Sequence, residues 1–189
     1  MDDRRFLTWM ALAVLLVLPT PPQSWAAGVL VEALDTPDPN VIALSTNELV
    51  HAEIVFDGEF GVTGSDLRVV GLPQGWLLSA SPNPSAASAV GNIMSSGGIL
   101  SFESCQTLRT LFYSMTIFAT SNEFDVMIYL DGSEGGNTPP FDCAVVYRCD
   151  GPVFTRVCVG SIGLCINSSC LLPVEETTWA SVKAMYGRE

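Results

Sequence analysis

The sequence FDCAVVYRCDGPVFTRVCVGSIGLCINSSC, residues 141–170, holds five of the six cysteines of the chain. Cysteine at this density is typical of secreted domains, because glutathione and thioredoxin keep cytosolic thiols reduced. The stretch therefore predicts an oxidising compartment and a fold whose strands are held together by disulfides. It contains no catalytic or cofactor motif, so it indicates where the protein resides and leaves its activity open.

The cysteines allow fifteen connectivities, and the sequence alone does not choose among them. They are Cys105, Cys143, Cys149, Cys158, Cys165 and Cys170. Proximity along the chain favours Cys149 with Cys158 across a turn at residues 150–152 and Cys165 with Cys170 across a tight loop. Cys105 would then pair with Cys143. No CxxC motif occurs, so we predict three disulfides and no zinc site.

Residues 1–26 have the three-part layout of a secretory signal peptide. Arg4 and Arg5 precede an apolar run over residues 6–18, and small residues follow it. We place the cleavage after Ala26, and cleavage after Ala27 fits nearly as well. The apolar run is too short for a helix to cross a hydrocarbon core of ~30 Å. We therefore expect a secreted or cell-surface protein with no membrane segment after cleavage.

The chain is strongly acidic. Its 189 residues carry a formal net charge of −12, from 20 acidic against 8 basic residues. The leader contains two residues of each sign, so its removal leaves the charge unchanged. Such a surface repels phosphate backbones and anionic lipid headgroups, which argues against nucleic acids and membrane surfaces as partners. The length suits one domain with a real hydrophobic core.

Short apolar and β-branched runs alternate with turn residues from position 28 to position 171. We expect strands over residues 29–34, 49–56, 67–72, 76–80, 89–94, 99–103, 108–120 and 124–130. The sequence Ser-Ser-Gly-Gly at 95–98 predicts a hairpin, and we expect 108–120 to pair with 124–130. The pattern predicts an all-β antiparallel sandwich spanning residues 28–171.

The C-terminal segment, residues 172–189, has a different pattern. Trp179, Val182 and Tyr186 fall on one face at helical spacing, and acidic residues precede them. The segment predicts a short amphipathic helix. Because a helix this short is marginal alone in water, we expect it to dock on the sandwich of its own chain. Docking on a partner, or a sorting role, is the alternative.

Candidate catalytic and metal-binding residues are few. His51 is the single histidine, and without a GxSxG elbow it does not predict a catalytic triad. Residues 131–142 loosely follow a calcium loop, with oxygen side chains at Asp131, Ser133 and Asp142. We expect a solvated loop there and keep calcium as the alternative. We predict no catalytic residue, no cofactor and no enzymatic activity; a secreted hydrolase using paired carboxylates is the least favoured alternative.

Four segments resemble known sequences: residues 62–76 (VTGSDLRVVGLPQGW), residues 81–84 (SPNP), Cys105 and residues 152–155 (PVFT). They are similar to uncharacterised secreted proteins of environmental bacteria that look like cohesin-type β-sandwiches. The resemblance covers roughly residues 28–171 and implies a cohesin-like fold and export, with no known activity. The sequence shows neither a dockerin partner nor a second cohesin-like repeat.

We therefore expect an exported, non-enzymatic structural or interaction module, extracellular or at the cell surface. Its partner would be another extracellular protein or a glycan. A carbohydrate-binding module is the main alternative, because such modules share the sandwich and bind sugars through exposed aromatic side chains. Trp76 and Trp179 are the only tryptophans after the leader.

Overall fold

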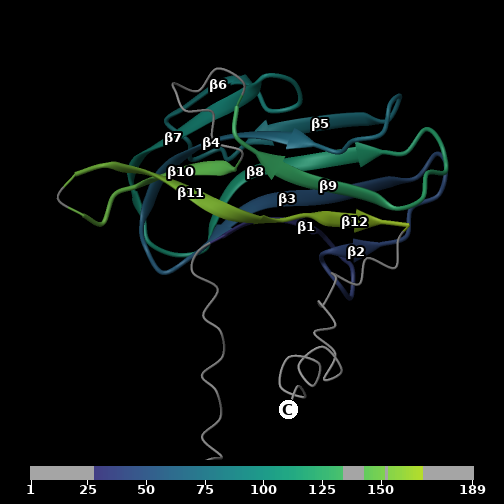
Figure 1. The fold of residues 1–189 in the computed structure, drawn as a ribbon, viewed down its shortest axis with the longest axis horizontal. Helices are drawn as coiled ribbons and strands as arrows, with labels where there is room; N and C mark the ends of the chain where they lie inside the picture. Colours follow the sequence, from purple (N-terminus) through teal and green to yellow (C-terminus); the bar gives the residue numbers. More distant parts are fainter. Residues whose placement is uncertain (1–27, 134–142, 152, 168–189) are drawn as a thin grey trace, which may run out of the picture.

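The computed structural model describes residues 28–133, 143–151 and 153–167 (Figure 1). The predicted signal peptide with its cleavage site at Ala26, most of the predicted calcium loop and the predicted C-terminal helix lie outside these residues. Every regular element in the described ranges is a β-strand, which confirms the all-β class there. Within the same ranges there is no helix long and apolar enough to cross a membrane.

The 12 strands form one hydrogen-bonded sheet that β11 divides into two parts, and these two parts, here called the first and the second sheet, face each other across the core (Figure 1). Neighbouring strands within each part are antiparallel except β12 and β2, which pair parallel. The first sheet has the order β1-β3-β8-β5. Its strands are β1 (Gly28–Ala33), β3 (Leu49–Asp57), β8 (Thr110–Phe118) and β5 (Leu77–Pro82).

The second sheet is organised around one long strand, β4 (Val62–Val70), which pairs with β7, β10 and β9. Its other strands are β6 (Ser88–Asn92), β7 (Gly97–Gln106), β9 (Val126–Asp131), β10 (Ala144–Arg148), β12 (Leu164–Ile166) and β2 (Val41–Ile42). The remaining strand, β11 (Thr155–Ile162), connects the two sheets. Its first half pairs antiparallel with β10, and its last three residues pair parallel with β1.

The core consists of the inward-facing residues of both sheets, as the alternating pattern predicts. Phe102 of β7 packs against Phe112 of β8, with ring centroids 6.2 Å apart, and so joins the two sheets. Phe112 also stacks on Phe56 of β3 at 6.2 Å. These aromatic contacts fill the middle of the sandwich.

Each predicted strand overlaps an observed one, but β4 begins at Val62, five residues before the predicted strand over 67–72, and β2, β10, β11 and β12 were not assigned from the sequence. One predicted pairing is confirmed and one is not. The hairpin at residues 95–98 is confirmed, since β6 and β7 pair antiparallel across it. The expected pairing of 108–120 with 124–130 is wrong: β8 pairs with β3 and β5, whereas β9 pairs with β4 and β12. The connection between β8 and β9 crosses from one sheet to the other. Its ends are fixed by backbone bonds from Ala119 to Glu48 and from Asp125 to Asn167.

The disulfides differ from the predicted pairing. Cys143 bonds to Cys158, so the predicted Cys149–Cys158 bridge is wrong. The turn expected at residues 150–152 does separate β10 from β11, but the register places Val145 opposite Cys158. Cys149 lies four residues further along, about 13 Å at ~3.3 Å per residue, which is too far for a disulfide.

The second described bridge joins Cys105 to Cys149, so the predicted Cys105–Cys143 bridge is also wrong. Gln106 of β7 and Arg148 of β10 both pair with Val62 at the start of β4. The cysteines next to them therefore meet across β4, with their Cα atoms 5.8 Å apart. Cys165 is disulfide-bonded as well, and its predicted partner, Cys170, lies outside the described residues.

Gly61 lies under the Cys105–Cys149 bridge. A Cβ atom at position 61 would come within 2.5 Å of the sulfur of Cys105 and 3.3 Å of that of Cys149. We expect Gly61→Ala to lower the free energy of unfolding by about 1 to 3 kcal/mol, because the bridge must move to make room. Urea denaturation without reductant measures this. Gly160→Ala is the matched control, since a Cβ there meets no atom within 4 Å; equal losses in both variants would contradict the assignment.

Trypsin separates the disulfide pairings without further proteases. Its cleavage sites at Arg109, Arg148 and Arg156 put Cys105, Cys143 and Cys149 on three different peptides. Non-reducing peptide mapping should link peptide 69–109 to 149–156, and peptide 110–148 to 157–183. A link between 149–156 and 157–183 would restore the pairing expected from proximity and overturn the one described here.

Candidate functional site

The strands β6, β7, β4, β10 and β11 lie side by side, and residues on one side of them form two rows across the five strands. The register gives one row as Val90, Ile99, Asp66, Val145 and Cys158, and the next as Ser88, Ser101, Gly64, Tyr147 and Arg156. Gly64, Asp66 and Val145, in the middle of the rows, are buried, so the exposed parts lie on β6 and β7 at one end and on β11 at the other. We call these ten residues the stapled face.

Both described disulfides hold the strands of the stapled face. The Cys105–Cys149 bridge ties the end of β7 to the end of β10, across β4. The Cys143–Cys158 bridge ties the residue before β10 to β11. The relative positions of three strands, β7, β10 and β11, are therefore fixed by covalent bonds as well as by the backbone hydrogen bonds of the sheet. A surface built in this way is ordered before any partner binds it.

The centre of the stapled face is an ion pair between a buried carboxylate and an exposed guanidinium. Asp66 is only 2% exposed, and its Oδ2 lies 3.5 Å from Nη2 of Arg156. Its other oxygen, Oδ1, accepts no hydrogen bond from any described residue. The guanidinium of Arg156 also lies over the ring of Tyr147, 5.9 Å from its centroid. Because a buried carboxylate is costly without its cation, Asp66 fixes the position of Arg156.

The charge of Asp66 raises the pKa of two tyrosines, Tyr147 and Tyr113. Burial raises the pKa of Tyr147, the charge of Asp66 raises it further, and Arg156 opposes both effects. Tyr113 belongs to β8 in the opposite sheet, where burial and then the charge of Asp66 raise its pKa to about 12. Both phenols are therefore neutral throughout the physiological range. They can donate hydrogen bonds but cannot serve as bases there.

The part of the stapled face on β6 and β7 is apolar and open to solvent. Val90 and Ile99 are cross-strand neighbours with exposed fractions of 68% and 44%. Beside them the hydroxyls of Ser88 and Ser101 lie 2.8 Å apart. An exposed apolar pair with a polar rim is the composition expected of a contact surface.

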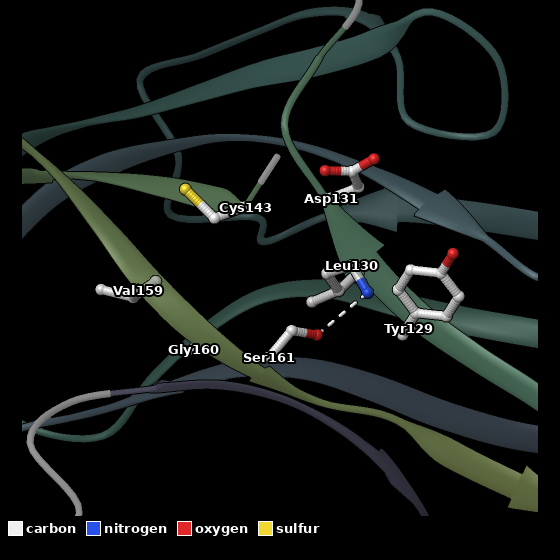
Figure 2. A pocket seen from close by; sticks show the side chains of 7 residues that line it. All are labelled: Tyr129, Leu130, Asp131, Cys143, Val159, Gly160 and Ser161. Atoms are coloured by element: carbon white, nitrogen blue, oxygen red, sulfur yellow. Dashed lines mark hydrogen bonds between the residues drawn. The ribbon is translucent and has the colours of Figure 1, made fainter. Parts of the chain in front are cut away.

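A shallow pocket of about 480 Å³ lies between β9 and β11 (Figure 2). Its lining residues are Tyr129, Leu130, Asp131, Cys143, Val159, Gly160 and Ser161. Figure 2 shows three polar side chains in the lining, Tyr129, Asp131 and Ser161, and the last two already have partners. The Ser161 hydroxyl accepts a hydrogen bond from the Leu130 amide at 3.0 Å, and Asp131 forms an ion pair with Arg68 at 2.9 Å.

The predicted calcium loop can be assessed only at its start. Asp131, its first expected ligand, has its carboxylate engaged by Arg68 and by the amide of Gly132. Ser133 is described, and residues 134–142, including Asp142, are not. Across the described ranges, no cluster of three or more His, Cys, Asp or Glu side chains could hold a metal ion.

Two other residues singled out from the sequence have structural surroundings. His51 is exposed on β3, as expected, and its Nδ1 lies 3.1 Å from the hydroxyl of Thr116. Trp76 is buried, and its indole N–H donates to the hydroxyl of Ser121 at 3.1 Å. A buried indole cannot stack on a sugar, so Trp76 is not a binding platform for a carbohydrate. Trp179 lies outside the described residues.

Sequence reasoning did not find the residues at the centre of the stapled face. Asp66, Tyr147 and Arg156 come from three strands, and nothing in their spacing links them. One signal was present: Asp66 directly precedes the run over residues 67–72 that was expected to form a strand. A charge at such a position requires a partner, and Arg156 is one of only 8 basic residues in the chain.

Deprotonation of Tyr113 should lower the free energy of unfolding at alkaline pH. Its pKa is raised from 10.0 to about 12, so the folded state holds the phenolic proton more tightly than the unfolded state. This contribution is complete below about pH 10 and is lost as the pH rises through about 12, up to about 2 to 3 kcal/mol. We expect Tyr113→Phe to flatten this fall, measured by urea denaturation at about pH 9 and about pH 11. The half-exposed Tyr129, as Tyr129→Phe, is the control; an unchanged pH dependence in Tyr113→Phe would contradict the assignment.

No family model and no curated protein matches the sequence. Several solved structures are similar to the chain. The seventh ScaB type I cohesin from Pseudobacteroides cellulosolvens is 13% identical, with 78% of this chain and 96% of that chain covered and a TM-score of 0.49. A type I cohesin–dockerin complex from Clostridium thermocellum is 6% identical, covers 75% and 99%, and has a TM-score of 0.47. A type II cohesin domain from the cellulosome of Acetivibrio cellulolyticus is 9% identical, covers 74% and 95%, and has a TM-score of 0.41. Each of these three structures contains a cohesin module.

Proposed function

We propose that the chain is an exported, non-enzymatic interaction module that binds another extracellular protein through the stapled face. The observation that carries the proposal is the exposed Val90–Ile99 pair, which adjoins an ordered ion pair on strands tied by two disulfides. The layout of residues 1–26 and the disulfides support export. The proposal concerns the class of partner, a folded protein or peptide surface.

The chemistry of the stapled face suits a protein partner. Val90 and Ile99 offer apolar area that loses water on contact, and the serine hydroxyls beside them can form hydrogen bonds at the rim. Arg156 is held by Asp66 and Tyr147, so little side-chain entropy is lost when it makes a contact. Because the chain carries a net charge of −12, a neutral or basic partner would meet the least long-range repulsion.

The same face is poorly suited to catalysis. Asp66 is its only acid, and it is buried and paired with Arg156. Paired carboxylates able to exchange protons with a substrate, as a hydrolase would need, are not brought together on it. This supports the proposal of a binding module over the hydrolase alternative.

Affinity capture with matched surface variants tests the proposal. The full chain is exported, immobilised and exposed to the extracellular fraction of its source culture, next to the variants Ile99→Asp and Leu108→Asp. Ile99 belongs to the stapled face, whereas Leu108 is an exposed leucine in the connection between β7 and β8. A charge placed in an apolar contact should weaken binding by at least about tenfold, which corresponds to about 1.4 kcal/mol.

The expected result is a protein retained by the native chain and by Leu108→Asp but lost with Ile99→Asp. Retention of the same proteins by all three baits would overturn the role of the stapled face. A glycan array, run with and without calcium, is the second arm. Binding of a glycan there, with no protein captured, would replace the proposed function by the carbohydrate-binding alternative.

A further inference from the structure

A second exposed apolar surface lies on β9, β12 and β2, apart from the stapled face. The register places Val41 of β2 and Met127 of β9 on either side of Cys165, and Tyr129 follows two residues along β9 on the same side. All three flanking side chains are exposed, whereas their neighbours Ile42, Ile128 and Leu164 face the core. We call Val41, Met127 and Tyr129 the Cys165 face.

The chain leaves the described structure at this surface. β12 ends at Ile166, and Asn167 then fixes the direction of the chain. Its side chain accepts a hydrogen bond from the Leu44 amide at 2.7 Å and donates to the carbonyls of Leu44 and Glu123 at 2.6 and 2.9 Å. The described chain therefore ends beside the Cys165 face.

Cys165 supplies a covalent link at the centre of the same surface. It is disulfide-bonded, and Cys170 is the one other cysteine of the sequence that takes part in neither described bridge. A bridge from Cys165 to Cys170 would anchor the C-terminal segment at this point. Trp179 lies nine positions after Cys170. Four steps of extended chain from Cys170 to Val174 span about 13 Å at ~3.3 Å per residue, and five helical steps add about 7 Å, while adjacent strands lie only ~4.8 Å apart. The segment can therefore reach every residue of the face.

The sequence of the C-terminal segment complements this surface. Trp179, Val182 and Tyr186 recur at helical spacing and would form one apolar stripe. A short helix with such a stripe is stable only when the stripe packs on an apolar surface. The exposed apolar side chains of the Cys165 face offer such a surface and would lose contact with water on packing. We propose that residues 174–189 dock through Trp179, Val182 and Tyr186 on the Cys165 face of their own chain. Because the segment is tethered, its effective concentration at the face far exceeds that of any free partner.

Fluorescence quenching of the full exported chain tests this docking. After the leader is removed, Trp76 and Trp179 are the only tryptophans, and Trp76 is buried. Acrylamide is the quencher, because it is uncharged and insensitive to the acidity of the protein. We expect little quenching in the native chain. Met127→Asp should release the segment and make about half of the tryptophan fluorescence quenchable, since one of two tryptophans becomes accessible.

Met94→Asp is the matched control, because Met94 and Met127 are 43% and 45% exposed and Met94 lies in the turn between β6 and β7. It should leave quenching at the native level. A native chain in which half of the fluorescence is already quenchable would overturn the docking, and so would Met127→Asp with native quenching. Protection that falls on dilution of the protein would assign the surface to a second copy of the chain. None of these outcomes depends on a partner at the stapled face, so the two proposals stand or fall separately.

Discussion

The rest of the structure depends on the disulfide between Cys105 and Cys149, which crosses β4 above Gly61. β4 pairs with three other strands, so a shift in its register would disturb most of the second sheet. The two described bridges close segments of 44 and 15 residues. In the chain-entropy account they contribute about 4 and about 3 kcal/mol, comparable to the ~5 to 15 kcal/mol by which most domains are stable. The bridge leaves no room for a side chain at position 61, so it requires a glycine there.

The sequence was sufficient to predict the class of fold and eight of the twelve strands, because both follow from local alternation of apolar and polar residues. It was not sufficient to predict which strands meet. The connection between β8 and β9 crosses the core, and no residue in it signals the crossing. The predicted disulfide pairing was wrong for the same reason. Proximity along the chain favoured Cys149 with Cys158, whereas the register of the β10–β11 hairpin separates these two cysteines. Register depends on the whole sheet, and short spacings do not report it.

The stapled face shows the same limit for function. Its rows combine residues from five strands, and Ser88 and Arg156 share a row although they are far apart in the sequence. Cysteine density did indicate where the domain is held most rigidly, and that region carries the face. What could not be anticipated is that Asp66 would be buried beneath Arg156. The carboxylate of Asp66 pairs with Arg156 and so orients that side chain. This role is structural and not catalytic.

The parallel pairing of β1 with β11 has a consequence for the order in which the chain can fold. Gly28 lies opposite Gly160, so the first strand to be synthesised gains one of its two neighbours only after almost the whole domain has been made. Contacts this distant in sequence are slow to form, because the entropy of closing the loop is lost before the contacts can compensate for it. Until then β1 has only β3 beside it, with one edge unpaired. The nascent domain thus stays incomplete until its C-terminal third is available, and the closing strand also carries a half-cystine, Cys158.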